Sequence, residues 1–300
     1  MTVSMSKQKI RFIINPISGT KHKDQLPSQI ETHLDHTRFD YEIFVSQYAG
    51  HAAILAKDAV NQHVDILAVA GGDGSINEVG TPLIGTDLAL AVIPCGSGNG
   101  LSRCLDLPLD PVKALQVING GHKRKIDTVD INGTPFISIS GTGYDAKVAE
   151  DYSKDPRRGF DTYFKYILRN YITMKEQPYT IVMPDQTLDV QAFFISFANS
   201  NQMGYDFPIS PHASLWDGKV DLCIVQKPNP LELPIMGGFM IDGMMDKAPK
   251  VKIIQTPEAT IIRPKADVIN LDGESVMMEK DLHIKVNPLS LNIICHETQK

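Results

Sequence analysis

Two short apolar segments each run directly into a glycine-rich loop. Residues 64–69 are followed by Gly71-Gly72-Asp73-Gly74, and residues 88–93 are followed by Pro94-Cys95-Gly96-Ser97-Gly98. Predicted strands that alternate with predicted helices in this part of the chain imply right-handed crossovers and a parallel sheet. The chain before about residue 125 is therefore predicted to be an α/β domain. Its other predicted elements are strands at 10–14 and 41–45 and helices at 51–60 and 111–118.

The pattern changes after about residue 125. Strand-like segments now follow one another with turn signals between them, such as Asn132-Gly133, and only residues 160–174 and 231–245 have a helical pattern. This half is predicted to be a mostly antiparallel β-sandwich, with a barrel as the alternative. We expect domains at residues 1–125 and 126–300, and a return of the last residues to the first domain stays open. The predicted strands are 127–131, 135–140, 179–183, 190–198, 220–225, 251–255, 260–263 and 282–286.

Charge and cysteine content exclude several classes of protein. The net charge is −6, whereas a nucleic-acid-binding domain needs a basic footprint, so no nucleic-acid partner is expected. The four cysteines are widely spaced and form no C-x-x-C pair, which suits reduced thiols in the cytoplasm. No apolar run reaches the roughly 20 residues that span a bilayer. A cytoplasmic location is expected, and any membrane contact must come from a local patch and be transient.

Both glycine loops follow predicted parallel strands at the carboxyl edge, where open α/β sheets bind ligands. Glycine lets the backbone approach a phosphate closely, and the helix that begins near Ser75 would present N–H groups to an anion. Asp73 would be repelled by polyphosphate unless a Mg²⁺ ion lies between them. The alternative is that both loops are only tight turns, because neither is a Walker A motif or a dinucleotide fingerprint.

The glycine loops are part of an ordered set of motifs that resembles the diacylglycerol/sphingosine kinase family. The resemblance covers nearly the whole chain and includes both domains. The motifs are Asn15-Pro16-Ile17-Ser18-Gly19, Ser46 with Gly50-His51-Ala52, residues 71–78, residues 94–99, Gly141-Thr142-Gly143-Tyr144-Asp145-Ala146, residues 217–222 and Leu271-Asp272-Gly273-Glu274. The resemblance implies a phosphofructokinase/NAD kinase-like first domain and a bacterial diacylglycerol kinase type of catalysis.

The resemblance also implies roles for individual residues. Asp73 would hold the catalytic Mg²⁺ network, Asp272 would be the base that faces the γ-phosphate, with Glu274 beside it, and Asp145 would lie on the lipid side. Asp217 and the carbonyls of Ser214 and Lys219 would form a second, structural magnesium site. The implied ATP-binding residues are Asn15, Ser18, Gly19, Ser46, Gly71, Gly72, Asp73, Gly74, Ser75, Ile76, Asn77 and Ser97.

From the residues alone, the alternatives are that Asp272-Gly273 is an ordinary hairpin turn, that Asp73 is a helix-capping carboxylate and that Asp217 belongs to a surface turn. Asp145 is placed in a loop, where a solvated carboxylate is the alternative to a substrate contact. Residues 154–169 combine basic side chains, including Arg157 and Arg158, with aromatic ones. They form either an interfacial flap or an amphipathic helix packed on the β domain.

The function implied is ATP-dependent transfer of the γ-phosphate to a lipid hydroxyl, of diacylglycerol or of a related glycerolipid or sphingoid base. The expected cofactors are ATP and Mg²⁺, the expected partner is a membrane lipid met by peripheral contact, and a homodimer is compatible with the sequence. Two alternatives stay open. One is an NAD kinase-like or sugar-phosphate kinase with a soluble substrate, and the other is a catalytically silent lipid or nucleotide sensor.

Overall fold

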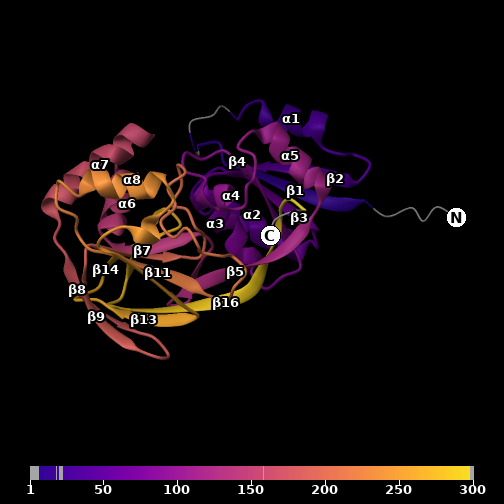
Figure 1. Cartoon of the computed structure of the whole chain (residues 1–300). Helices are drawn as coiled ribbons and strands as arrows, with labels where there is room; N and C mark the ends of the chain where they lie inside the picture. The colour runs from indigo at the N-terminus through magenta and orange to yellow at the C-terminus, as the bar shows by residue number, and fades with distance from the viewer. Residues whose placement is uncertain (1–6, 18, 20–22, 158, 298–300) are drawn as a thin grey trace. The chain divides into compact units, whose positions relative to one another are not determined.

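The computed structural model describes residues 7–17, 19, 23–157 and 159–297. The chain forms two compact units. The first comprises Met1–Ile126 and Leu289–Lys300, and the second comprises Asp127–Pro288. The chain passes from the first unit to the second within β5 (Lys123–Ile131) and returns within β16 (Asp281–Ile294). Figure 1 colours the chain by residue number, so both strands can be followed there.

The first unit is built on a parallel sheet in the order β2-β1-β3-β4, which the end of β16 extends. Asn292 and Ile293 of β16 pair in parallel with Ala89 and Leu90 of β4. All residues of β3 and β4 are buried, as their continuous apolar sequences predict. The predicted α/β class is therefore confirmed. The strands are β1 (Gln8–Ile14), β2 (Phe39–Val45), β3 (Ile66–Gly71) and β4 (Ala89–Pro94).

Helices connect these strands, and α1 packs against α5 while α2 packs against α3. The boundaries of α5 follow from local chemistry. The Asp110 carboxylate accepts the Lys113 N–H at 3.0 Å, Pro111 opens the helix, and Gly121 ends it in the left-handed conformation. The helices are α1 (Leu26–His33), α2 (His51–Asn61), α3 (Asp73–Gly80), α4 (Gly100–Cys104) and α5 (Pro111–Gly120), with a 3₁₀ turn at Thr81–Leu83.

The second unit has two sets of antiparallel strands. One sheet has the order β12-β11-β10-β7-β14-β15, and the other set is β16-β13-β8-β9 with β5 and β6 alongside. Side chains from both sets, such as Ile181, Phe197 and Ile261, share one buried core. The predicted antiparallel β-sandwich is confirmed. The strands are β6 (Thr134–Phe136), β7 (Ile139–Gly143), β8 (Gln177–Val182), β9 (Thr187–Ala192), β10 (Phe194–Ala198), β11 (Val220–Val225), β12 (Val251–Thr256), β13 (Glu258–Ile262), β14 (Asp267–Leu271) and β15 (Glu274–Met278).

Among the described residues of this unit, three helices accompany the strands, and one of them was not predicted. The helix α6 (Tyr144–Lys154) follows β7 directly, so the expectation that Asp145 lies in a loop is wrong. Gly143, at φ +97°, makes the turn from strand to helix without a connecting loop, and Ala146, Val148 and Ala149 give α6 its buried side. The other helices are α7 (Phe160–Thr173) and α8 (Leu233–Ile241), with a 3₁₀ turn at Met245–Lys247.

Candidate functional site

The predicted site residues fall into two groups, one in each unit. The group in the first unit is Asn15, Ser18, Gly19, Ser46, Gly71, Gly72, Asp73, Gly74, Ser75, Ile76, Asn77 and Ser97. The group in the second unit is Asp145, Ser214, Asp217, Lys219, Asp272 and Glu274. Ser18 lies outside the described residues.

Three loops of the first unit leave its sheet at the same edge. β1, β3 and β4 are neighbouring parallel strands whose ends are in register, with Ile14 opposite Ala70 and Gly71 opposite Pro94. The Asn15 N–H extends the pairing by donating to the Ala70 carbonyl at 3.0 Å. The carboxyl ends of parallel strands are where open α/β sheets bind ligands, so this edge is the candidate site.

The loops meet through their backbones. A Cβ atom on Gly96 would lie 2.4 Å from the Cα of Gly72, and a Cβ atom on Gly19 would lie 1.8 Å from the carbonyl oxygen of Cys95. Gly19 also has φ +69°, a conformation that favours glycine. The glycines are therefore required for the contact between the loops. They do more than form three separate turns.

Two asparagines fix the geometry of this edge. Asn15 Nδ2 donates to Ser75 Oγ at 2.8 Å, which ties the loop after β1 to α3. Asn99 Oδ1 accepts the Gly96 N–H and Asn99 Nδ2 donates to the Gly96 carbonyl, both at 2.9 Å. Asn99 was part of the motif but was not predicted as a site residue. The Asn15 bond links two segments at this edge, and the Asn99 bonds fix the turn after β4.

The N-terminus of α3 begins at this edge, with Gly72 as the residue before the helix and Asp73 in its first turn. The first amide groups of a helix have no intrahelical acceptor and favour an anion. The Ile76 side chain belongs to the core at 1% exposure, so only its backbone is available to a ligand. The side-chain oxygen of Asn77 accepts a hydrogen bond from the Thr81 hydroxyl at 3.4 Å.

Two predicted serines lie at the ends of strands. Ser46 follows β2, is buried, and donates its N–H to the Ile14 carbonyl at 2.9 Å. Ser97 is half-buried in the loop after β4. Both hydroxyls therefore belong to loops at carboxyl ends of parallel strands.

Lys23 is a feature that the sequence did not reveal. Its side chain is buried, and Nζ donates to the Asn15 carbonyl at 2.5 Å. Burial lowers the pKa of Lys23, and the nearby Cys95 opposes that shift. A buried cation beside a glycine-lined helix start favours the binding of phosphate. Lys23 lies eight residues after Asn15, beyond the motif that ends at Gly19, so the motif did not mark it.

In the second unit, Asp272 occupies the two-residue turn between β14 and β15. Asp272 and Gly273 both have positive φ, +48° and +92°, as in a type I′ hairpin turn. The carboxylate is buried and folds back on the preceding segment. It accepts the backbone N–H of Ile137 at 2.7 Å and those of Ser138 and Ile139 at 2.9 Å each. These bonds fix the orientation of the carboxylate, so Asp272 is more than a surface turn residue.

Glu274 and Asp272 have different surroundings. Glu274 pairs with Leu271 at the start of β15 and is exposed, whereas the Asp272 side chain is 4% exposed. The Asp272 N–H also donates to the Ile139 carbonyl at 3.0 Å. The hairpin therefore presents one anchored and one solvated carboxylate.

Asp145 lies in the first turn of α6 and is buried, at 4% exposure. Burial raises the pKa of Asp145 to about 7, although Ala146 and Asn270 partly offset that rise. Within the described part of the chain, neither carboxylate oxygen makes a geometrically complete hydrogen bond. A Cβ atom on Gly141 would lie 2.1 Å from Asp145 Oδ2, so glycine is needed to admit this carboxylate. A buried carboxyl group with a raised pKa marks a candidate functional site.

The segment predicted to hold a second metal is a short loop before β11. The Asp217 Oδ1 atom accepts the Lys219 N–H at 3.0 Å, and Ser214 Oγ accepts the Trp216 N–H at 3.3 Å. Across residues 7–17, 19, 23–157 and 159–297, no three His, Cys, Asp or Glu side chains are grouped to hold a metal ion.

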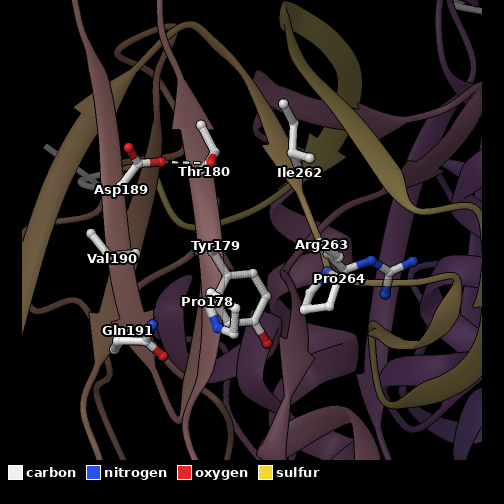
Figure 2. A pocket seen from close by; sticks show the side chains of 9 residues that line it. All are labelled: Pro178, Tyr179, Thr180, Asp189, Val190, Gln191, Ile262, Arg263 and Pro264. Atoms are coloured by element: carbon white, nitrogen blue, oxygen red, sulfur yellow. Dashed lines mark hydrogen bonds between the residues drawn. The ribbon is translucent and has the colours of Figure 1, made fainter.

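The second unit also has an open pocket of about 400 Å³ on β8, β9 and β13. Figure 2 shows the Thr180 hydroxyl bonded to Asp189 across β8 and β9, with Tyr179 and Arg263 nearby. The Arg263 guanidinium points away from the labelled side chains of β8 and β9 and donates to the Met278 carbonyl at 2.9 Å. Arg263 therefore supports the β14–β15 hairpin from its far end. Of the predicted site residues that the structure describes, none lines this pocket.

Comparisons with known proteins bear on both units. Residues 9–131 match the family described as "Diacylglycerol kinase catalytic domain", and residues 138–295 match "YegS C-terminal NAD kinase beta sandwich-like domain". A diacylglycerol kinase of Staphylococcus aureus (strain MRSA252) is 30% identical over 89% of this chain and 86% of that protein. One of Staphylococcus carnosus is 29% identical over 89% of both.

Two solved structures from Bacillus anthracis strain Sterne share the fold. One has a TM-score of 0.80 at 21% identity and covers 97% of this chain and 98% of its own. The other, described as a diacylglycerol kinase, has a TM-score of 0.74 at 19% identity and covers 97% of both chains. In the part of the chain that the structure describes, no helix is both long and apolar enough to cross a bilayer.

Proposed function

The chain belongs to the diacylglycerol kinase family, and we propose that it phosphorylates the free hydroxyl of diacylglycerol. It is a lipid kinase that uses ATP. The names of its relatives support diacylglycerol over the sphingoid bases that the sequence also allows. The observation that carries the assignment of the ATP site is the contact between Gly72 and Gly96 at the carboxyl edge of the first unit.

The polyphosphate of ATP is proposed to lie against this edge. The first amides of α3 would bind phosphate oxygens, and Gly72 and Gly96 leave the backbone uncovered. Asn15 and Ser75, joined by their 2.8 Å hydrogen bond, would orient the loop after β1. The remaining proposed ATP-binding residues are Ser18, Gly19, Ser46, Gly71, Asp73, Gly74, Ile76, Asn77 and Ser97.

Positive charge must offset that of the phosphates. Asp73 in the first turn of α3 supplies a carboxylate oxygen, the kind of ligand that Mg²⁺ prefers, beside amides that bind phosphate. Magnesium bound there would neutralise phosphate charge. Lys23 is proposed as a second, protein-borne cation, since its Nζ lies 2.5 Å from the Asn15 carbonyl.

Asp272 is proposed as the base. It would accept the proton of the lipid hydroxyl as the hydroxyl oxygen forms a bond to the γ-phosphorus and the bond to the β–γ bridging oxygen breaks, releasing ADP. Three backbone N–H groups hold its carboxylate in one orientation, as a positioned base requires. Glu274 is the proposed neighbouring carboxylate.

Asp145 is proposed to contact the lipid head, because it is buried and sits at a helix start beside Gly141. Lipid binding further requires peripheral contact with a membrane. Asp217, with the carbonyls of Ser214 and Lys219, is proposed as a structural magnesium site, since Asp217 already closes a tight turn on the Lys219 N–H.

The experiment that tests this proposal offers γ-labelled ATP with diacylglycerol, sphingosine or NAD in parallel, with and without Mg²⁺. Label in phosphatidic acid is the expected result. Label in sphingosine phosphate or in NADP would overturn the assigned acceptor. Binding of ATP with no transfer to any of them would identify a sensor instead.

A further inference from the structure

The helix α8 exposes an apolar face. It carries no charged residue from Leu233 to Ile241. Met236 is buried against the core of the second unit, and Phe239 and Met240 pack there too. Away from these packed residues, Ile235 is 54% exposed and Ile241 is 72% exposed. Leu231, just before the helix, is 85% exposed, so apolar side chains are exposed at both ends of α8.

The helix α7 of the same unit carries an exposed apolar stripe. Phe164, Leu168 and Ile172 are spaced by four residues and therefore lie on one side of the helix. Their exposed fractions are 45%, 48% and 77%. The exposed basic residues Lys165 and Arg169 each follow a member of this stripe directly in the sequence.

The two helices belong to the same unit, and the C-terminal end of α7 is bonded to the segment that precedes α8. The Tyr171 hydroxyl of α7 donates to the Pro228 carbonyl at 2.8 Å, and Lys227 Nζ donates to the Met174 carbonyl at 2.7 Å. The segment with Lys227 and Pro228 leads into α8, and Figure 1 labels both helices in the second unit. We name Leu231, Ile235, Ile241, Phe164, Leu168 and Ile172 the α7–α8 surface.

The helix that carries the proposed lipid contact, α6, is bonded to α7. Tyr144, next to Asp145 in α6, donates its hydroxyl to the Ile167 carbonyl of α7 at 2.6 Å. Tyr152 of α6 and Tyr163 of α7 also pack edge to face, with centroids 5.4 Å apart. The backbone that leads into Leu168 is thus bonded to the residue beside Asp145.

We propose that the α7–α8 surface inserts into the interfacial layer of a lipid bilayer, with α8 as the inserted helix. The proposal rests on the proposed function, since a diacylglycerol kinase must reach a substrate held in a bilayer. Apolar side chains would enter the acyl boundary. Lys165, Arg169 and the exposed Lys175 would stay at the level of anionic headgroups, whereas the exposed Asp161 and Asp242 limit the net attraction. Binding therefore depends more on the apolar side chains than on charge.

The test uses the full chain and vesicles of phosphatidylcholine and phosphatidylglycerol without diacylglycerol. The double variant Ile235→Asp/Ile241→Asp and, separately, Leu168→Asp/Ile172→Asp are compared with the wild type by sedimentation. Ile54→Asp on α2 is the matched control, because Ile54 is 55% exposed and lies in the first unit. Circular dichroism and thermal unfolding confirm that each variant is folded.

Each double variant should lose at least about tenfold in vesicle partitioning, and Ile54→Asp should bind as the wild type does. Activity on long-chain diacylglycerol in vesicles should fall in parallel, while activity on a water-dispersed short-chain diacylglycerol stays within about twofold. Unchanged partitioning of both double variants would overturn the proposal. So would a wild-type dimer that Ile235→Asp/Ile241→Asp converts to a monomer, since a second copy would then cover the surface. Vesicle binding needs no phosphoryl transfer, so failure of the proposed function would leave this readout intact.

Discussion

A side-chain carbon on Gly96 would lie 2.4 Å from the Cα atom of Gly72. The loops after β3 and β4 thus touch through backbone alone, and neither can gain a methyl group without displacing the other. This contact places two glycine loops against the start of α3 and forms the basis of the proposed phosphate site.

Gly96→Ala should weaken ATP binding. The added Cβ must push the loop away from Gly72, and overpacking of this kind costs about 1–3 kcal/mol. The expected result is a rise of about tenfold or more in the Kd for ATP, measured by calorimetry. Gly120→Ala is the control, because a Cβ there meets only the His122 ring at 3.4 Å. Equal effects of the two substitutions would contradict the assigned contact.

Lys23→Met should raise the KM for ATP by about tenfold or more, since charge-assisted hydrogen bonds contribute about 1.5–3 kcal/mol. The turnover number should change less, because Lys23 is assigned to binding. Lys57→Met on the exposed side of α2 removes a surface charge from the same unit and should leave the KM unchanged. An unchanged KM in Lys23→Met would exclude a phosphate contact.

Asp73→Ala should shift the Mg²⁺ concentration that gives half-maximal rate by at least about tenfold, because a charged oxygen ligand is lost. Asp110→Ala is the matched control, since Asp110 caps α5 through the Lys113 N–H. That control should cost about 1 kcal/mol of stability and leave the Mg²⁺ dependence unchanged. If Asp73→Ala behaved in the same way, Asp73 would be a capping residue only.

Asp145→Asn should stabilise the protein at neutral and higher pH. The pKa of Asp145 rises from 3.8 to about 7 on folding, so ionisation disfavours the folded state as pH increases through that range. The advantage of the variant in the free energy of unfolding should therefore grow from pH 5 to pH 7 and level off above, at up to about 4 kcal/mol. Urea unfolding of both proteins at pH 5, 6, 7 and 8 measures this difference in the free energy of unfolding. A difference that is independent of pH would show that Asp145 is ionised in the folded protein.

Local sequence was sufficient to predict the first unit and its glycine edge. The apolar runs of β3 and β4 are short, buried and bounded by glycine, so both the parallel sheet and the position of Asp73 follow from neighbouring residues. The antiparallel strands of the second unit could also be predicted, from turn signals such as Asn132-Gly133. Both residues of this turn have positive φ.

Contacts between distant residues could not be predicted. The carboxylate of Asp272 meets the amides of Ile137 to Ile139, over 130 residues earlier, and only the folded sandwich brings these together. Lys23 is similar, because the path of the loop after β1 decides its contact with Asn15. α6 was missed for a local reason. Its helical pattern begins immediately after Gly143, where a strand was expected to end in a loop.

The role of Asp272 is the central claim, and Asp272→Asn tests it most directly. The variant also replaces one acceptor oxygen by an NH₂ group facing backbone donors, so some loss of stability, about 1–3 kcal/mol, is expected. Asp130→Asn is the control, because Asp130 Oδ1 accepts the Gly133 N–H at 2.7 Å in another turn of the second unit.

The decisive measurement is the rate of γ-phosphate transfer to diacylglycerol by folded Asp272→Asn at saturating ATP, with the Kd for ATP measured on the same sample. We predict a loss of about 10²–10⁴ in turnover, with an unchanged Kd for ATP and normal turnover in Asp130→Asn. Turnover within about threefold of the wild type, in a variant that binds ATP normally, would contradict the assignment of Asp272 as the base.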